Sequence, residues 1–174
     1  MGTNMKVLLF FRVVLCFFAL FLSRLFPEAL VLWFAEKAAK ITALILFLNP
    51  PTLASEGAYL DVFSPNGILV NSSCSGVSFF SILTACIFWI LSERCRGFFA
   101  LILTFIASIA LSIPLAIFAN ALRISVAILV LNFTSGFLDE RFAPALHMFA
   151  GGVVFFSFLL FITLTLNFGY VKRN

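Results

Sequence analysis

The fold depends on one long apolar segment, residues 98–133, which reads FFALILTFIASIALSIPLAIFANALRISVAILVLNF. A membrane crossing needs about 20 apolar residues, so this segment is too long for one upright span and slightly short for two spans with a turn. Pro114 lacks a backbone N–H and disfavours helix just before it, and Asn120 and Arg123 then interrupt the hydrophobicity. We therefore expect one span over about residues 98–118.

The rest of the segment, residues 121–133, is expected to form a short re-entrant or interfacial helix, with residues 134–144 outside the membrane. In that arrangement Cys74, Arg123 and His147 meet at the extracytoplasmic face. If residues 121–133 crossed fully instead, His147 would begin on the side opposite Cys74. The basic C-terminal end would then lie outside, which the positive-inside bias disfavours.

The composition predicts an integral membrane protein. Hydrophobic residues make up 63% of the 174 residues, including 25 Phe, charged residues make up only 10%, and the mean hydropathy is +1.19. A soluble globule cannot bury so much apolar surface. We predict an all-α fold, a polytopic membrane helical bundle of about 5–6 hydrophobic helices including the short re-entrant or interfacial segment. No shift in composition marks a second domain, so residues 1–174 are expected to form a single integral membrane domain.

The predicted domain has three parts: N-terminal helices over residues 1–48, an extracytoplasmic loop over residues 49–73, and core helices with the candidate site over residues 74–174. The loop contains two acidic residues and no Lys or Arg, whereas the turn at residues 93–96 is basic. Cytoplasmic loops are enriched in Lys and Arg, so the loop is assigned to the outside and the turn to the inside. The 11 Lys and Arg against 7 Asp and Glu are interpreted as this topology signal, and no nucleic-acid partner is expected.

Two apolar runs make up the N-terminal part. Residues 7–22 resemble a signal peptide in the order of their charges, but no small-x-small cleavage site follows them, so we expect a retained helix. Residues 29–48 are interrupted by Glu36, Lys37 and Lys40, which fall within about 100° of one another on a helical wheel. This pattern fits either a tilted span with a charged inward face or an interfacial amphipathic helix, and both interpretations stay open.

The four cysteines do not indicate a disulfide framework. Cys16 and Cys86 lie in apolar runs, and Cys95 lies in the basic turn. Cys74 alone has a polar, turn-rich setting. The single histidine, His147, has no cysteine at zinc-ligand spacing, so neither a metal nor another cofactor is expected.

Cys74 is the candidate nucleophile. Ser72 or Ser73 can cap a helix that starts near Cys74, and the partial positive charge of a helix N-terminus favours a thiolate. His147 is the candidate acid and base, and Arg123 can donate hydrogen bonds to an oxyanion that develops on an attacked carbonyl. Together these groups are suited to nucleophilic acyl transfer.

Asn120 lies three residues before Arg123 on the same helical face and can orient the guanidinium or a substrate. Taken singly, each candidate also has an ordinary structural explanation, because cysteine packs as a small apolar residue and boundary arginines extend to headgroups. One alternative is a small transporter or channel subunit with Arg123 and His147 along its pathway, which expects charged groups near mid-membrane. Another is a non-catalytic scaffold, for which Cys74 is dispensable.

Around these residues the sequence resembles the exosortase/archaeosortase family of multi-pass membrane transpeptidases. The proposed catalytic set of that family is a Cys in Cys-Ser-Gly, an Arg in Pro-x-Ala-x-x-x-Asn-x-x-Arg-Ile, and a later His. The corresponding residues here are Cys74-Ser75-Gly76, Pro114-Leu115-Ala116-Ile117-Phe118-Ala119-Asn120-Ala121-Leu122-Arg123-Ile124 and His147-Met148-Phe149-Ala150-Gly151, in matching order and spacing. The resemblance covers residues 71–155, and the short chain is similar to compact forms such as those called exosortase K.

The resemblance implies a sorting reaction in the cell membrane. Substrates would be exported proteins whose C-terminal tails carry a short motif, a hydrophobic helix and a basic cluster. The enzyme would cleave at the extracytoplasmic face, hold a thioester on Cys74 and pass the new carboxyl end to an acceptor, left open among lipid, glycan and water. His147 would act as acid and base, and Arg123 would stabilise the intermediate. The supporting residues would be Asn120, Ser75 and Gly76.

Overall fold

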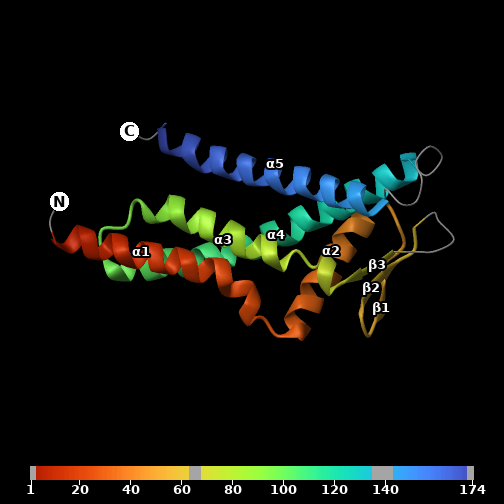
Figure 1. Ribbon diagram of the computed structural model, residues 1–174, viewed down its shortest axis with the longest axis horizontal. Coiled ribbons are helices and arrows are strands. Elements are labelled where there is room, and N and C mark those ends of the chain that lie inside the picture. Colours follow the sequence, from red (N-terminus) through yellow and green to blue (C-terminus); the bar gives the residue numbers. More distant parts are fainter. Residues whose placement is uncertain (1–2, 63–67, 135–142, 172–174) are drawn as a thin grey trace. The chain divides into compact units, whose positions relative to one another are not determined.

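Five α-helices and a small antiparallel sheet make up the part of the chain that the structure describes (Figure 1). The structure is a computed structural model, and it describes residues 3–62, 68–134 and 143–171. The helices are α1 (Thr3–Phe21), α2 (Glu28–Ile45), α3 (Val77–Ser92), α4 (Phe98–Thr134) and α5 (Ala143–Val171), the strands are β1 (Thr52–Ala54), β2 (Gly57–Leu60) and β3 (Ile68–Asn71), and two 3₁₀ turns are η1 (Leu22–Leu25) and η2 (Ser72–Cys74). The predicted helical membrane fold is confirmed, and the sheet is a feature that the sequence did not predict.

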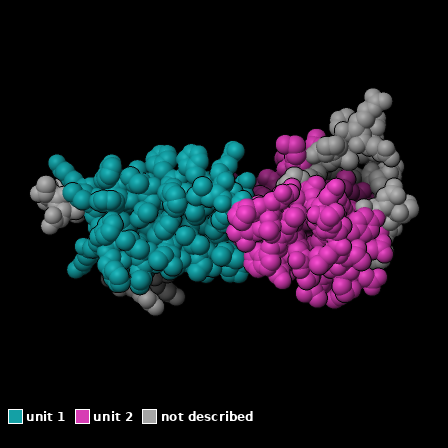
Figure 2. Space-filling view, turned by 90° about the horizontal axis from the view of Figure 1, so that it is seen from below, with its two compact units in different colours: residues 1–26, 77–116, 159–174 teal, residues 27–76, 117–158 magenta. Residues whose placement is uncertain are grey.

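The chain forms two compact units (Figure 2). Unit 1 consists of residues 1–26, 77–116 and 159–174, and unit 2 consists of residues 27–76 and 117–158. Helices α1 and α3 therefore belong to unit 1, and helix α2 and the sheet belong to unit 2. Helices α4 and α5 each contribute residues to both.

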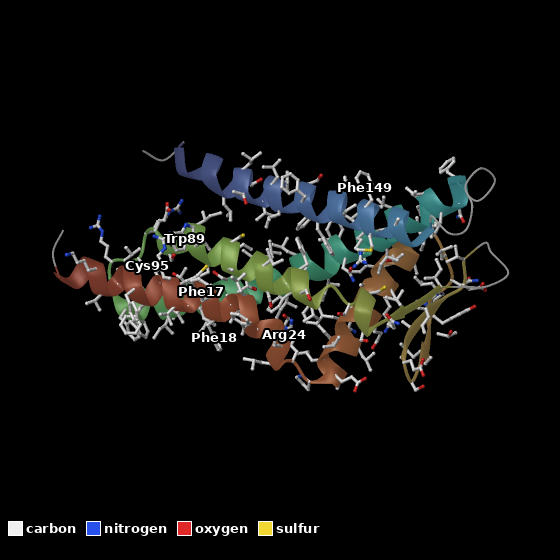
Figure 3. The ribbon with its side chains drawn as sticks, viewed as in Figure 1. Phe17, Phe18, Arg24, Trp89, Cys95 and Phe149 are labelled. Carbon is white, nitrogen blue, oxygen red and sulfur yellow. The ribbon has the colours of Figure 1, made fainter. Side chains whose placement is uncertain are left out.

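Within the described residues, three helical segments are long and apolar enough to cross a membrane, namely Lys6–Leu25, Phe98–Phe133 and Met148–Leu166. Helix α3 is also apolar and is shorter, with 16 residues. Large hydrophobic side chains cover their outer surfaces, as Phe17 and Phe18 do on α1 (Figure 3). Such a surface is unfavourable in water and favourable in lipid, so this is a membrane protein.

Helix α1 packs antiparallel against α3 in unit 1. The thiol of Cys16 lies 3.8 Å from the carbonyl oxygen of Ala85, to which it donates. The amide of Ser23 donates to Oγ of Ser81 at 2.8 Å. Residue numbers rise along α1 as they fall along α3, so the two helices run in opposite directions. Ala19 is fully buried between them, and a small residue at this position lets the two backbones approach closely.

Arg12 joins the first half of α1 to the end of α3. Its Nη2 donates to the carbonyl oxygen of Trp89 at 2.6 Å and to Oε1 of Glu93 at 3.3 Å. Its guanidinium carbon lies 4.0 Å from the centre of the Trp89 ring, which is a cation–π contact. Trp89 and Cys95 lie at this end of unit 1 and Arg24 at the other (Figure 3). The start of α1 and the basic turn at residues 93–96 therefore share one end.

The predicted break after residue 118 is wrong, because α4 is one helix of 37 residues with Pro114 inside it. In the turn before the proline, the hydroxyl of Ser112 donates to the carbonyl of Ser108 at 2.7 Å, so this buried polar group is satisfied within the helix. Residues 121–133 thus continue α4 and do not form a separate re-entrant or interfacial helix. At 1.5 Å per residue, α4 is about 55 Å long, well beyond the hydrocarbon thickness of about 30 Å. A continuous helix crosses a membrane once, so its two ends can lie on opposite sides.

The sheet packs against α2 in unit 2. Its order is β1-β2-β3 with antiparallel pairing, and Gly57 pairs with both Ala54 and Asn71. The layer between helix and sheet is apolar and tightly buried. The buried apolar side chains of these elements include Phe34, Ala35, Ala38 and Ala39 of α2 and Ala58, Leu60 and Val70 of the strands. Small residues dominate the helix side, so the sheet can lie close to α2 and is held by it.

Helix α2 is amphipathic and is not among the helices that are long and apolar enough to span. Its charged residues make local pairs. Nζ of Lys40 lies 2.5 Å from Oε1 of Glu36, and Nζ of Lys37 lies 5.7 Å from the centre of the Trp33 ring. Helix α2 also packs against the sheet, and both interpretations of this segment, a tilted span or an interfacial amphipathic helix, stay predictions.

Candidate active site

Cys74 ends a 3₁₀ turn, η2, that follows strand β3 directly. The amide of Ser75 donates to the carbonyl of Ser72 at 3.2 Å and closes this turn. Helix α3 begins at Val77, so the helix start expected near Cys74 lies three residues further on. The side chain of Cys74 is half-buried. The candidate nucleophile is therefore carried by a tight turn between the sheet and α3.

Asn120 of α4 holds this turn by its main chain. Its Nδ2 donates to the carbonyl oxygen of Cys74 at 2.5 Å, across 46 residues of sequence. Asn120 is fully buried, and its Oδ1 has no hydrogen-bond partner among the described residues. A buried amide that fixes a backbone carbonyl contributes more than a solvated one, because its loss leaves that carbonyl unpaired. The contact fixes the position of Cys74 through its main chain and does not involve the thiol.

Gly76 gives Asn120 the room to reach the turn. A β-carbon on Gly76 would lie 2.8 Å from both Cβ and Cγ of Asn120. Gly76 also has φ +76, a left-handed conformation that disfavours residues with a side chain. Two independent constraints therefore require glycine at this position. The contact with Asn120 therefore explains why the third residue of Cys74-Ser75-Gly76 is glycine.

A hydrogen-bond pair holds α4 in place beside Asn120. The carbonyl oxygen of Ala121 accepts from Oγ1 of Thr42 at 3.2 Å and from Oγ of Ser125 at 2.8 Å. Thr42 is a fully buried residue of α2. Helix α2 thus supports the sheet on one side and contacts the motif segment of α4 on the other. Both elements that carry the candidate site share this support.

Arg123 extends from α4 to helix α5. A β-carbon on Gly151 would lie 2.8 Å from Nε of Arg123 and 3.3 Å from its Cδ. The guanidinium carbon lies 5.4 Å from the centre of the Phe155 ring. The side chain of Arg123 is therefore packed against a glycine and an aromatic face, and a lipid-headgroup position is not needed to explain it. The Phe155 ring and the close approach of Gly151 restrict the side chain of Arg123 to few orientations.

His147 belongs to helix α5, and its side chain lies outside the described residues. Positions 147, 151 and 155 are four residues apart, and residues at that spacing share one face of a helix. Two members of this face, Gly151 and Phe155, contact Arg123. The backbone at position 147 is thus one turn from the contact with Arg123.

Two of these contacts are not predictable from the sequence alone. Gly151 stands at the end of the motif His147-Met148-Phe149-Ala150-Gly151, but its role becomes clear only from its distance to Arg123. Phe155 has only its four-residue spacing as a signal. Among the residues that the structure describes, no group of three or more His, Cys, Asp or Glu is placed to hold a metal ion.

These features define a class of protein. It is a helical membrane protein in which Asn120 is hydrogen-bonded to the Cys-Ser-Gly turn and Arg123 contacts α5, within one compact unit. The chain matches the family described as Transmembrane exosortase (Exosortase_EpsH) over residues 1–164. It therefore belongs to the transmembrane exosortase family, as its motifs indicate. No curated protein and no solved structure matches it.

Proposed function

We propose that the protein is a cysteine transpeptidase of the cell membrane that cleaves exported proteins within their C-terminal sorting tails. The hydrogen bond from Asn120 to the carbonyl of Cys74 carries this proposal, because it joins the Cys-Ser-Gly turn to the Asn-x-x-Arg motif. Packing of Arg123 on the α5 face that includes position 147 adds the third motif. Family membership supports the same reaction class.

In the first step, the thiolate of Cys74 attacks the carbonyl carbon of the scissile peptide bond. The negative charge that develops on the carbonyl oxygen is stabilised by N–H groups of Arg123. His147 gives a proton to the leaving amine, the C–N bond breaks, and a thioester remains on Cys74. In the second step, His147 takes a proton from the acceptor as it attacks the thioester. The thiolate is released, and the new carboxyl end is joined to the acceptor.

The site is assigned to the extracytoplasmic side. The start of α1 and the basic turn at residues 93–96 share one end of unit 1, and Lys and Arg mark cytoplasmic ends. Helix α4 leaves that turn at Phe98 and carries Asn120 and Arg123 in its second half. A substrate tethered by its own transmembrane helix diffuses in two dimensions, which raises its effective concentration at such a site.

The test is detection of the acyl-enzyme. A tail-bearing exported protein from the same genome is co-expressed with wild-type enzyme and with Cys74→Ala and Cys74→Ser variants at matched levels. Wild type should process the substrate and yield a hydroxylamine-sensitive adduct on the peptide that contains Cys74. Both variants should give neither product, and Cys16→Ala, Cys86→Ala and Cys95→Ala serve as controls that keep activity. Full processing by Cys74→Ala would contradict the mechanism and favour a scaffold or transporter subunit.

A further inference from the structure

Among the strands that the structure describes, β3 is an edge strand, and it leads directly to the candidate nucleophile. It is the last strand in the order β1-β2-β3, and it ends at Asn71, immediately before the turn Ser72–Cys74. An edge strand presents N–H and C=O groups that can pair with another chain. The edge strand β3 thus ends three residues before Cys74.

The orientation of Val70 shows which groups of β3 point outward. A β-carbon on Gly57 would overlap the carbonyl oxygen of Val70, so this carbonyl points toward β2. The N–H and C=O of one strand residue point to the same side, and the side alternates along the strand. Leu69, in the middle of β3, therefore directs both of its main-chain groups away from β2. The same alternation directs those of Leu53, at the middle of β1, to the opposite edge of the sheet.

The composition of β3 lacks the usual protection of an edge. Sheets exposed to water protect their edges with proline, lysine or other charged residues. Strand β3 reads Ile68-Leu69-Val70-Asn71 and has neither proline nor charge, whereas Pro50 and Pro51 stand just before β1. Ile68 and Val70 also favour strands, and the side chain of Leu69 is 37% exposed. A strand of this kind is suited to pairing.

We propose that the segment of the substrate tail at the scissile bond binds as an added strand on β3, with hydrogen bonds to the main-chain N–H and C=O of Leu69. This inference rests on the proposed function and adds the form in which the substrate is recognised: an extended peptide read mainly through its backbone. Pairing of this kind gives affinity from main-chain hydrogen bonds and selectivity from alternate side chains. The substrate residue opposite Leu69 meets an exposed apolar side chain, so an apolar or β-branched residue is favoured there.

We assign the added strand to the β3 edge and not to the β1 edge because β3 is the strand nearer to Cys74. Strands lie about 4.8 Å apart, so a peptide on the outer side of β1 would be about four strand spacings from one on the outer side of β3. Strand β3 ends three residues before Cys74, so a peptide paired with Leu69 lies next to the strand that leads into the turn with the thiol. Helix α2 supports the sheet from one face, which keeps the edge fixed relative to the turn.

The experiment uses full-length enzyme in lipid nanodiscs and a set of synthetic peptides. Each peptide is the C-terminal tail of a tail-bearing exported protein from the same genome and carries one N-methyl group at successive amides around the cleavage site. N-methylation removes a donor and blocks close pairing, so alternate positions should lose about tenfold or more in kcat/KM, and the intervening positions should change little. Equal effects at successive positions, or no effect, would overturn strand addition.

Variants of the enzyme make the matched comparison. Leu69→Pro removes an outward N–H from β3, and Leu53→Pro removes the equivalent N–H from the β1 edge. Proline is tolerated at outward edge positions, so both should fold, which is verified by size-exclusion chromatography and circular dichroism. Leu69→Pro should lower kcat/KM by about three- to tenfold, and Leu53→Pro should leave it near wild type. Equal activity of the two folded variants would overturn the proposal.

A binding measurement separates this proposal from the proposed function. The same N-methylated peptides are titrated against Cys74→Ala enzyme in nanodiscs, where no chemistry is required. Alternating loss of binding without any processing by wild type would support strand addition and overturn the transpeptidase assignment. Processing by wild type, together with binding that is insensitive to every N-methyl group, would overturn strand addition alone.

Discussion

Gly151 and Arg123 are in direct contact, since a β-carbon on this glycine would lie 2.8 Å from Nε of the arginine. The contact connects α5 to the second half of α4 inside unit 2. It also makes the glycine a sensitive probe, because any side chain there must displace the guanidinium. The next residue, Gly152, has nothing within 4 Å of the same position and provides a matched control.

Gly151→Ala should therefore reduce substrate processing by about 10- to 100-fold, as expected when a catalytic group is displaced by a fraction of an ångström to 1 Å. Gly152→Ala should stay near wild type, because its methyl group meets open space. Processing rates are compared in cells at matched membrane levels of the two variants. Equal processing rates of the two variants would show that catalysis does not depend on the position of the Arg123 side chain beside Gly151.

Gly76→Ala should impair both stability and activity. The left-handed conformation costs about 1–2 kcal/mol for a residue with a β-carbon, and the added methyl group also displaces Asn120 from Cys74. Gly97→Ala is the control, because a methyl group added at Gly97 would have no atom within 4 Å. Thermal unfolding in detergent and processing are measured for both. A wild-type unfolding temperature and rate for Gly76→Ala would contradict the packing described for the turn.

Arg123→Lys should lower the processing rate by about a hundred- to thousandfold, the usual cost of one oxyanion contact. Lysine keeps the charge but lacks the planar fork of donors, and it cannot stack on the Phe155 ring in the same way. Arg24→Lys, at an exposed position of unit 1, should be close to wild type. Near-normal processing by Arg123→Lys would reduce this residue to a marker of topology.

Asn120→Asp should loosen the turn that carries Cys74. A carboxylate cannot donate to the carbonyl of Cys74, and position 120 is fully buried, where a charge is unfavourable, so we expect a cost of about 1–3 kcal/mol in turn stability. Hydrogen exchange of the Ser75 amide, which closes the turn, should become faster. Asn49→Asp, at an exposed position, should leave that exchange rate unchanged. Unchanged exchange in Asn120→Asp would show that the turn is held by other contacts.

Topology is tested by labelling with a membrane-impermeant thiol reagent in intact cells. In a background with Cys16, Cys74 and Cys86 replaced by alanine, a cysteine at Ser55 should react, because Ser55 is exposed in the turn between β1 and β2. Native Cys95 should react only after the membrane is permeabilised. Labelling of Cys95 in intact cells would invert the assigned orientation.

The residues of the candidate site can be singled out from the sequence because their chemistry is rare in lipid. Cys74, Asn120 and Arg123 stand out against an apolar background, and two of them are joined by a hydrogen bond in unit 2. The continuity of α4 is not predictable from the same residues. Pro114, Asn120 and Arg123 resemble interruptions of the helix. A polar side chain does not end a helix, however, when another element provides its contact. Asn120 donates to the carbonyl of Cys74, and Arg123 packs on α5.

The sheet is unpredictable for a different physical reason. Its strands have only three or four residues, and two-stranded or three-stranded pieces of that size have little stability of their own. They form here because Ala58, Leu60 and Val70 pack on the small residues of α2. The pattern of residues in the strands, or in the helix, does not by itself predict that the two pack together.

The two tryptophans provide a spectroscopic reporter for each unit. Trp89 lies under the guanidinium of Arg12 in unit 1, and Trp33 lies near the ammonium of Lys37 in unit 2. A nearby cation alters indole emission, so each fluorescence signal depends on whether its own unit is folded. Single-tryptophan proteins made by Trp33→Phe or Trp89→Phe would therefore resolve two denaturation curves in one chain. Their midpoints would reveal whether the part with the candidate site melts before the helical pair α1 and α3.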